Sequence, residues 1–176
     1  MNKIVTLLAV LALTASCCGS KPEKRVHKLL MDRMLTLSVA ESCTGGSIAS
    51  RFTAMPGASA YFLCGVVSYS NASKHDILGV APEVIARHGA VSEEVARRMA
   101  EGARRISGAD CAIATTGIAG PAGGSAEKPV GTVWIAVATS HRTTAILKQC
   151  GSDRGQIIDR ASAFAISLLR DELNGK

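Results

Sequence analysis

The sequence is poor in aromatic residues, with only three Phe, two Tyr and one Trp among 176 residues. Its core must therefore be built from Ala, Val, Ile and Leu. The shortage also argues against nucleic-acid binding, because proteins commonly hold single strands by stacking the bases on aromatic rings. The formal net charge of +6 is spread along the chain, which suits small anionic ligands. We therefore predict a small-molecule ligand and no nucleic-acid partner.

Several familiar motifs are missing as well. Cys43, Cys64, Cys111 and Cys150 have no CxxC spacing, and the four histidines share no ligand spacing, so we predict neither a metal site nor a redox pair. The sequence contains neither GxxxxGKS/T nor GxGxxG, which excludes the phosphate loop of many ATPases and the dinucleotide fingerprint. The GxSxG turn of the α/β-hydrolases is absent too.

The N-terminal residues predict an export leader. An apolar or small-residue run of twelve, residues 4–15, follows a short positive segment. A membrane-spanning helix needs about 20 such residues, whereas a secretory signal needs about 7–15. The run ends in small residues before Cys17, which is similar to the lipidation site of bacterial lipoproteins, although Thr14 stands where Leu is usual. We predict a leader over residues 1–19, a lipid anchor at Cys17 and a location in the bacterial envelope; the alternative is an ordinary apolar helix in a cytoplasmic protein.

The remaining residues, 20–176, have the pattern of one α/β domain without internal repeats. Runs of apolar and β-branched residues predict strands over residues 35–40, 61–69, 111–116, 132–139 and 143–149. Helical periodicity and capping residues predict helices over residues 21–34, 47–52, 70–78, 92–105 and 157–173. Because helices and strands are interleaved, we expect an α/β sandwich around a mixed, partly parallel sheet.

The first candidate site is the segment from Ser42 to Gly46, which joins the strand predicted over residues 35–40 to the next helix. This arrangement puts a hydroxyl near a helix N-terminus, where unpaired N–H groups and the positive end of the helix dipole can bind an anion or a developing oxyanion. The alternative is that Ser42 or Thr44 merely caps the helix. The local sequence leaves both interpretations open.

Two further segments are candidates for the same site. A Gly-rich loop follows the strand that ends at Thr116, and such loops let backbone N–H groups approach phosphate closely. Lys74 lies on an early helical turn after another strand. It is either an ordinary solvated lysine or, if it is desolvated beside Ser42, a general base whose pKa has fallen.

Four segments together resemble a known family. They are AESCTGG at residues 40–46, FLCGVVSYSNASK at 62–74, GAVSEEVARRMAEGA at 89–103 and TGIAGPAGGSAEKPVGTVW at 116–134. The chain resembles the C-terminal domain of competence/damage-inducible protein A (CinA) over residues 26–173, in the stand-alone form that acts as a nicotinamide-nucleotide amidase. The resemblance implies a three-layer α/β/α fold and hydrolysis of nicotinamide mononucleotide to nicotinate mononucleotide and ammonia. It implies no metal and no organic cofactor.

The resemblance also implies roles for individual residues. Ser42 would be the nucleophile and Lys74 the general base, and backbone N–H groups around Thr44, Gly45 and Gly46 would stabilise the oxyanion. The other implied residues line the pocket or hold the ribose phosphate. They are Tyr69 and Asn71, which would also orient Lys74, then Thr116, Gly117 and Gly120 of the loop, with Lys128 and Arg154 as charge partners.

The sequence departs from the family pattern at one position. The family usually has a second arginine soon after the pair that is Asp153 and Arg154 here, but this chain has Ile158. Losing a phosphate-binding arginine would remove about 1.5–3 kcal/mol of charge-assisted hydrogen bonding. Either Arg160 substitutes for it, or the chain is a catalytically impaired nucleotide-binding or partner-binding module. Members of the family associate, so we also expect a homo-oligomer.

Overall fold

A five-stranded mixed sheet forms the centre of the computed structural model, which describes residues 22–175. The strands are β1 (Leu37–Glu41), β2 (Phe62–Val67), β3 (Cys111–Gly117), β4 (Thr132–Ala138) and β5 (Thr143–Gln149), in the spatial order β2-β1-β3-β4-β5. The central β1 pairs in parallel with both β2 and β3, whereas β4 is antiparallel to β3 and to β5. The predicted mixed, partly parallel sheet is confirmed.

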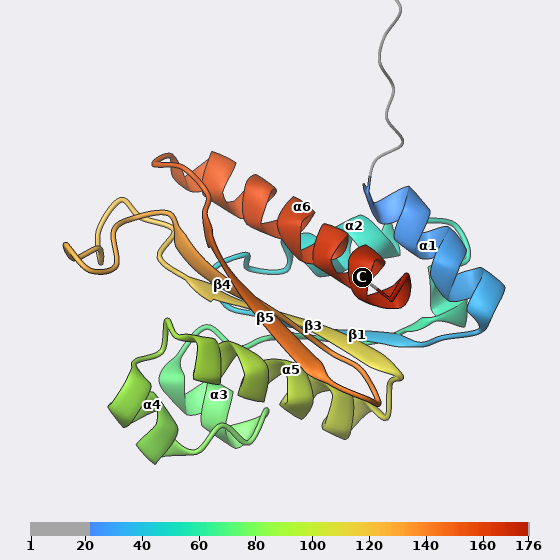
Figure 1. The fold of residues 1–176 in the computed structure, drawn as a ribbon, viewed down its shortest axis with the longest axis horizontal. Helices are drawn as coiled ribbons and strands as arrows, with labels where there is room; N and C mark the ends of the chain where they lie inside the picture. Colours follow the sequence, from blue (N-terminus) through green and yellow to red (C-terminus); the bar gives the residue numbers. More distant parts are fainter. Residues whose placement is uncertain (1–21, 176) are drawn as a thin grey trace, which may run out of the picture.

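Helices cover both faces of the sheet, which makes three layers (Figure 1). One face carries α1 (Pro22–Arg33), α2 (Ser47–Thr53) and α6 (Arg154–Leu173), and a short 3-10 turn, Ala58–Ala60, precedes β2. The other face carries α3 (Asn71–Asp76), α4 (Pro82–His88) and α5 (Glu93–Ser107). All these helices were predicted except α4, a seven-residue helix that begins with a proline. The three-layer α/β/α architecture is confirmed.

Two apolar layers hold the sandwich together. Leu30, Phe52 and Ile166 pack on the face that carries α1, α2 and α6. The layer under α5 is rich in alanine. Met99 and Leu78 are its largest fully buried side chains. Gly102 of α5 permits an especially close approach, because a Cβ atom there would lie 2.1 Å from the Leu78 carbonyl oxygen. The segment that follows α3 is thereby held against α5.

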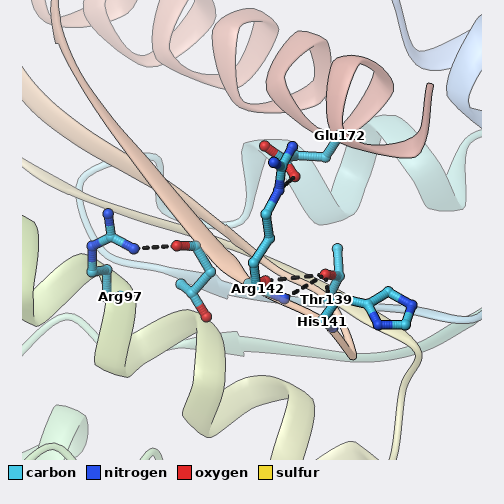
Figure 2. A network of polar contacts seen from close by, with 6 residues as sticks. Arg97, Thr139, His141, Arg142 and Glu172 are labelled. Atoms are coloured by element: carbon cyan, nitrogen blue, oxygen red, sulfur yellow. Dashed lines mark hydrogen bonds and ion pairs between the residues drawn. The ribbon is translucent and has the colours of Figure 1, made fainter. Parts of the chain in front are cut away.

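A polar network holds the β4–β5 turn at the edge of the sheet where the parallel strands begin (Figure 2). Arg142 forms an ion pair with Glu172 of α6 at 2.8 Å, and its backbone N–H donates to Thr139 Oγ1 at 3.2 Å. On the other side, Arg97 of α5 donates to the Thr143 carbonyl. The turn is therefore joined to both helical layers.

The predicted leader, residues 1–19 with Cys17, lies outside the described residues, so export and lipidation remain predictions. Among the helices within residues 22–175, none is both long and apolar enough to cross a membrane. The four cysteines of this described part are free thiols.

Candidate active site

The candidate site lies where the parallel strands end. Ser42 directly follows β1, Tyr69 lies two residues beyond β2, and Thr116 is the second-last residue of β3. In open α/β sheets ligands bind outside the carboxyl ends of the parallel strands. A pocket of about 280 Å³ opens at this edge. Its lining consists of Ser42, Cys43, Tyr69, Asn71, Lys74, Ala90, Val91, Thr116, Gly117, Ile118, Ala119, Gly120, Ala122, Gly123 and Arg154.

The structure brings Ser42 and Lys74 into contact. Lys74 Nζ lies 3.1 Å from Ser42 Oγ and donates to the Ser68 carbonyl oxygen at 2.8 Å. Only 1% of Lys74 is exposed, and this desolvation lowers the pKa of its amine. A buried amine with a lowered pKa can lose its proton and then accept the hydroxyl proton of Ser42. Lys74 is therefore not a solvated surface lysine.

Local structure explains why Lys74 points into the site. Ser70 caps α3, since its hydroxyl accepts from the Ser73 N–H while the Ser73 hydroxyl oxygen accepts from the Ser70 N–H. This capping box fixes the first turn of the helix, and Lys74 follows on the buried side. The Ser68 N–H continues the pairing of β2 with β1 by donating to the Glu41 carbonyl at 2.9 Å. The two halves of the Ser–Lys pair are therefore fixed to neighbouring strands.

Glu41, which the sequence analysis did not single out, takes the N-terminus of α2. Its carboxylate is 1% exposed and accepts hydrogen bonds from the N–H groups of Gly46 and Ile48, both at 3.1 Å, and of Ala49 at 2.8 Å. The positive end of this helix is thus already neutralised by the protein itself. The N-terminus of α2 is not available to an external anion in this conformation.

Two of the expected oxyanion donors, the N–H groups of Gly45 and Gly46, have partners within the protein in this structure. The Gly46 N–H donates to Glu41, and the Gly45 N–H donates to the Ser42 carbonyl at 3.1 Å. Neither glycine lines the pocket, and nor does Thr44, whose hydroxyl is 2.7 Å from that of Thr115. In the described part of this turn, only the N–H groups of Cys43 and Thr44 make no hydrogen bond to another residue. Of these two residues, only Cys43 lines the pocket.

Arg154 joins three parts of the pocket. As the first residue of α6, it donates from Nη1 to the Gly120 carbonyl and from Nη2 to the Tyr69 hydroxyl oxygen, both at 2.8 Å. The Gly-rich loop, the end of β2 and the start of α6 therefore meet at one guanidinium. Gly117 must be a glycine, because a Cβ there would lie 2.7 Å from the Thr132 carbonyl oxygen. Asn71 lines the pocket beside Tyr69.

The remaining predicted cations lie outside the pocket lining. Lys128 Nζ donates to the carbonyls of Val91 at 2.8 Å and His88 at 3.3 Å, so it braces the segment before α5. Ile158 is half-buried one helical turn after Arg154 and does not line the pocket. Arg160 does not line the pocket either, and its guanidinium lies beside Gly151.

Comparisons with known proteins agree with this architecture. A family model described as the CinA C-terminal domain matches residues 19–173. A putative competence-damage inducible protein of Desulforudis audaxviator is 55% identical over 122 residues, which is 69% of this chain and 30% of that protein. A CinA-like protein of Thermotoga maritima is 47% identical over 156 residues, 89% of this chain and 38% of that protein. The chain thus spans about a third of the length of these relatives.

The chain also matches two solved structures over nearly the whole length of each. A CinA superfamily protein from Klebsiella pneumoniae superposes with a TM-score of 0.85 at 35% identity, covering 88% of this chain and 97% of that one. The competence/damage inducible protein CihA from Agrobacterium tumefaciens gives a TM-score of 0.82 at 40% identity, covering 88% of this chain and 96% of that one.

Proposed function

The chain belongs to the family of CinA C-terminal domains, and we propose that it is an amidohydrolase that converts nicotinamide mononucleotide and water to nicotinate mononucleotide and ammonia. The observation that carries this proposal is the 3.1 Å contact between Lys74 Nζ and Ser42 Oγ inside a pocket. A buried amine on a serine hydroxyl is an arrangement that activates the oxygen as a nucleophile. The lowered pKa of Lys74 supports the same role.

In the first half-reaction, neutral Lys74 accepts the Ser42 proton while Ser42 Oγ attacks the carboxamide carbon. The N–H group of Cys43, which follows Ser42 and lines the pocket, donates to the oxyanion of the tetrahedral intermediate. The carbon–nitrogen bond then breaks, and the Lys74 ammonium returns the proton to the departing nitrogen. Ammonia leaves, and the acyl group remains as an ester of Ser42.

In the second half-reaction, neutral Lys74 accepts a proton from water, and the resulting hydroxide attacks the ester carbon. The bond to Ser42 Oγ breaks, and the Lys74 proton returns to that oxygen. The product leaves as the carboxylic acid, which ionises to nicotinate mononucleotide. The Ser68 carbonyl accepts a hydrogen bond from Lys74 and so keeps the amine aimed at Ser42.

The anionic end of the substrate fits the other side of the pocket. Arg154 uses one N–H on Gly120 and one on Tyr69, which leaves further guanidinium protons for a phosphate. The Tyr69 hydroxyl oxygen accepts from Arg154, so its own proton is available to a ligand oxygen. The sequence of residues 1–19 further leads us to propose export of this activity to the envelope.

One observation favours a second function, a nucleotide-binding module without turnover. Ile158 replaces an arginine of the family pattern, and that loss would weaken the hold on phosphate. The discriminating assay supplies nicotinamide mononucleotide to the purified protein and measures ammonia. Ser42→Ala tests the nucleophile, and Ser140→Ala, at an exposed serine outside this pocket, is the matched control.

The two proposals give different results in this assay. An amidase releases ammonia as wild type and as Ser140→Ala, and stops in Ser42→Ala. A binding module is stabilised by the nucleotide in thermal melting but releases no ammonia. Release that persists in Ser42→Ala would refute the assigned nucleophile.

A further inference from the structure

We propose that Thr116 distinguishes the carboxamide of the substrate from the carboxylate of the product, an inference that rests on the proposed function. Thr116 lines the pocket with Ser42 and is 1% exposed. Its hydroxyl donates to the Ala90 carbonyl oxygen at 2.8 Å. A carbonyl oxygen only accepts, and a threonine hydroxyl has a single proton. The proton is therefore committed to Ala90, and Thr116 Oγ1 faces a ligand as an acceptor alone.

An acceptor at this position separates the two molecules that differ only at the reacting group. A carboxamide carries two N–H protons and can donate one of them to Thr116 Oγ1. A carboxylate has no proton to donate, so its oxygens would meet the lone pairs of Thr116. A buried acceptor without a donor is unfavourable, and the product therefore binds more weakly than the substrate. This preference selects amides and helps to expel the acid.

The direction of the Thr116 hydrogen bond is held by its surroundings. The Ala90 carbonyl lies in the segment between α4 and α5, where Lys128 donates to the carbonyls of His88 and Val91 on either side. The Ser92 hydroxyl also donates to the Gly89 carbonyl at 2.8 Å. The carbonyls of His88, Gly89 and Val91 thus accept from Lys128 and Ser92, and the Ala90 carbonyl accepts from Thr116. The hydroxyl has no reason to turn its proton toward the pocket.

Two other residues of the pocket lining have the opposite polarity. Arg154 and Tyr69 both retain protons for a ligand, as argued above. The pocket therefore offers donors on Arg154 and Tyr69, which suit an anionic group, and an acceptor on Thr116, which suits an N–H group. A primary carboxamide attached to an anionic group matches this order, whereas a dianion with a carboxylate at the inner end does not.

The experiment compares Thr116→Val, which removes the hydroxyl at similar volume, with Thr116→Ser, which keeps it. Nicotinamide mononucleotide and nicotinate mononucleotide are titrated by calorimetry into Ser42→Ala protein, in which the substrate survives. The same Thr116 changes are then made in that background. We expect the amide-to-acid affinity ratio to fall by about tenfold with Val and to be kept with Ser. In the active enzyme, we expect Thr116→Val to lower the ratio of the product inhibition constant to KM by a similar factor.

The outcomes separate this inference from the proposed function. An unchanged affinity ratio in Thr116→Val would overturn the role of Thr116 even if the wild type releases ammonia. A wild type that releases no ammonia, but whose amide preference disappears with Val and is kept with Ser, would overturn the amidase and support the selectivity. If Thr116→Val does not fold, Thr116→Ala replaces it and is judged by the same ratio. Loss of preference in Thr116→Ser as well would assign the effect to packing and overturn the inference.

Discussion

Replacing Glu41 by glutamine tests how the Ser42 turn is held. The change keeps the shape of the side chain but replaces one acceptor oxygen by an NH₂ group. In the native protein, Oε2 accepts from Gly46 and Ile48, and Oε1 accepts from Ala49. Glutamine can place its single oxygen at only one of these positions. At least one N–H group then faces another donor inside the protein.

The size of the effect follows from this count. A hydrogen bond to a charged group contributes about 1.5–3 kcal/mol, and a buried donor left unsatisfied costs about 1–3 kcal/mol. Because Glu41 is 1% exposed, we expect Glu41→Gln to lower the free energy of unfolding by about 3 kcal/mol. The favourable interaction of the carboxylate with the helix dipole adds to this loss.

Urea unfolding followed by circular dichroism measures this loss. With a denaturant slope of about 2 kcal/mol/M, the midpoint should fall by roughly 1.5 M at an unchanged slope. Glu93→Gln is the matched control, since Glu93 is half-exposed and pairs at 2.8 Å with Arg97 on the surface of α5. Surface pairs of this kind contribute about 0–1 kcal/mol. Equal small losses in the two variants would refute the argument that Glu41 holds the turn.

Three further changes test the site. Lys74→Met should abolish ammonia release without lowering the free energy of unfolding in urea, because an apolar side chain avoids the desolvation of the amine. Desolvation lowers the pKa of Lys74, so kcat/KM should rise with pH through that lowered pKa and then level off; a decline over that range would contradict the base. Between this pKa and 10.5 the unfolded chain binds more protons than the native protein, so this group makes stability rise with pH in that window, which urea midpoints at several pH values can check. Arg154→Ala should raise KM for nicotinamide mononucleotide by roughly 10- to 100-fold and change kcat less, whereas a purely catalytic defect would show the reverse. Gly117→Ala should lower the melting temperature, because its Cβ would meet the Thr132 carbonyl oxygen at 2.7 Å and overpacking costs about 1–3 kcal/mol.

Most of the fold could be predicted because its elements carry strong local signals. Ser92 before two glutamates predicts the start of α5, and the structure shows Ser92 accepting from the Val95 N–H at 3.3 Å. The helix α4 was missed because seven residues span only two turns and show little periodicity, although Pro82 at its first position is a start signal. The start of α6 was predicted too late, since Asp153 caps it by accepting from Gln156.

The site was harder to predict because it depends on strand order. Ser42 and Lys74 are 32 residues apart, and they meet only because β1 and β2 are neighbours in the sheet. Nothing in the local sequence specifies that pairing. The role of Glu41 was missed for a related reason, since a carboxylate competes with an external anion for the same N–H groups. An acid directly before a turn into a helix was the available signal, but only its burial decides the competition.

The position of Ile158 affects the affinity for the phosphate of a nucleotide more than it affects the Ser42–Lys74 pair. Ser42 directly follows β1 and Lys74 lies on α3, whereas Ile158 lies on α6 and outside the pocket lining. An isoleucine there removes a charge that would act on phosphate, but it leaves the 3.1 Å contact between Lys74 and Ser42 intact. A module that only binds nucleotide has no use for a buried amine, whose desolvation lowers its pKa and costs folding free energy. The buried amine beside a hydroxyl therefore supports the proposed turnover over binding alone, and we expect Ile158 to act by raising KM.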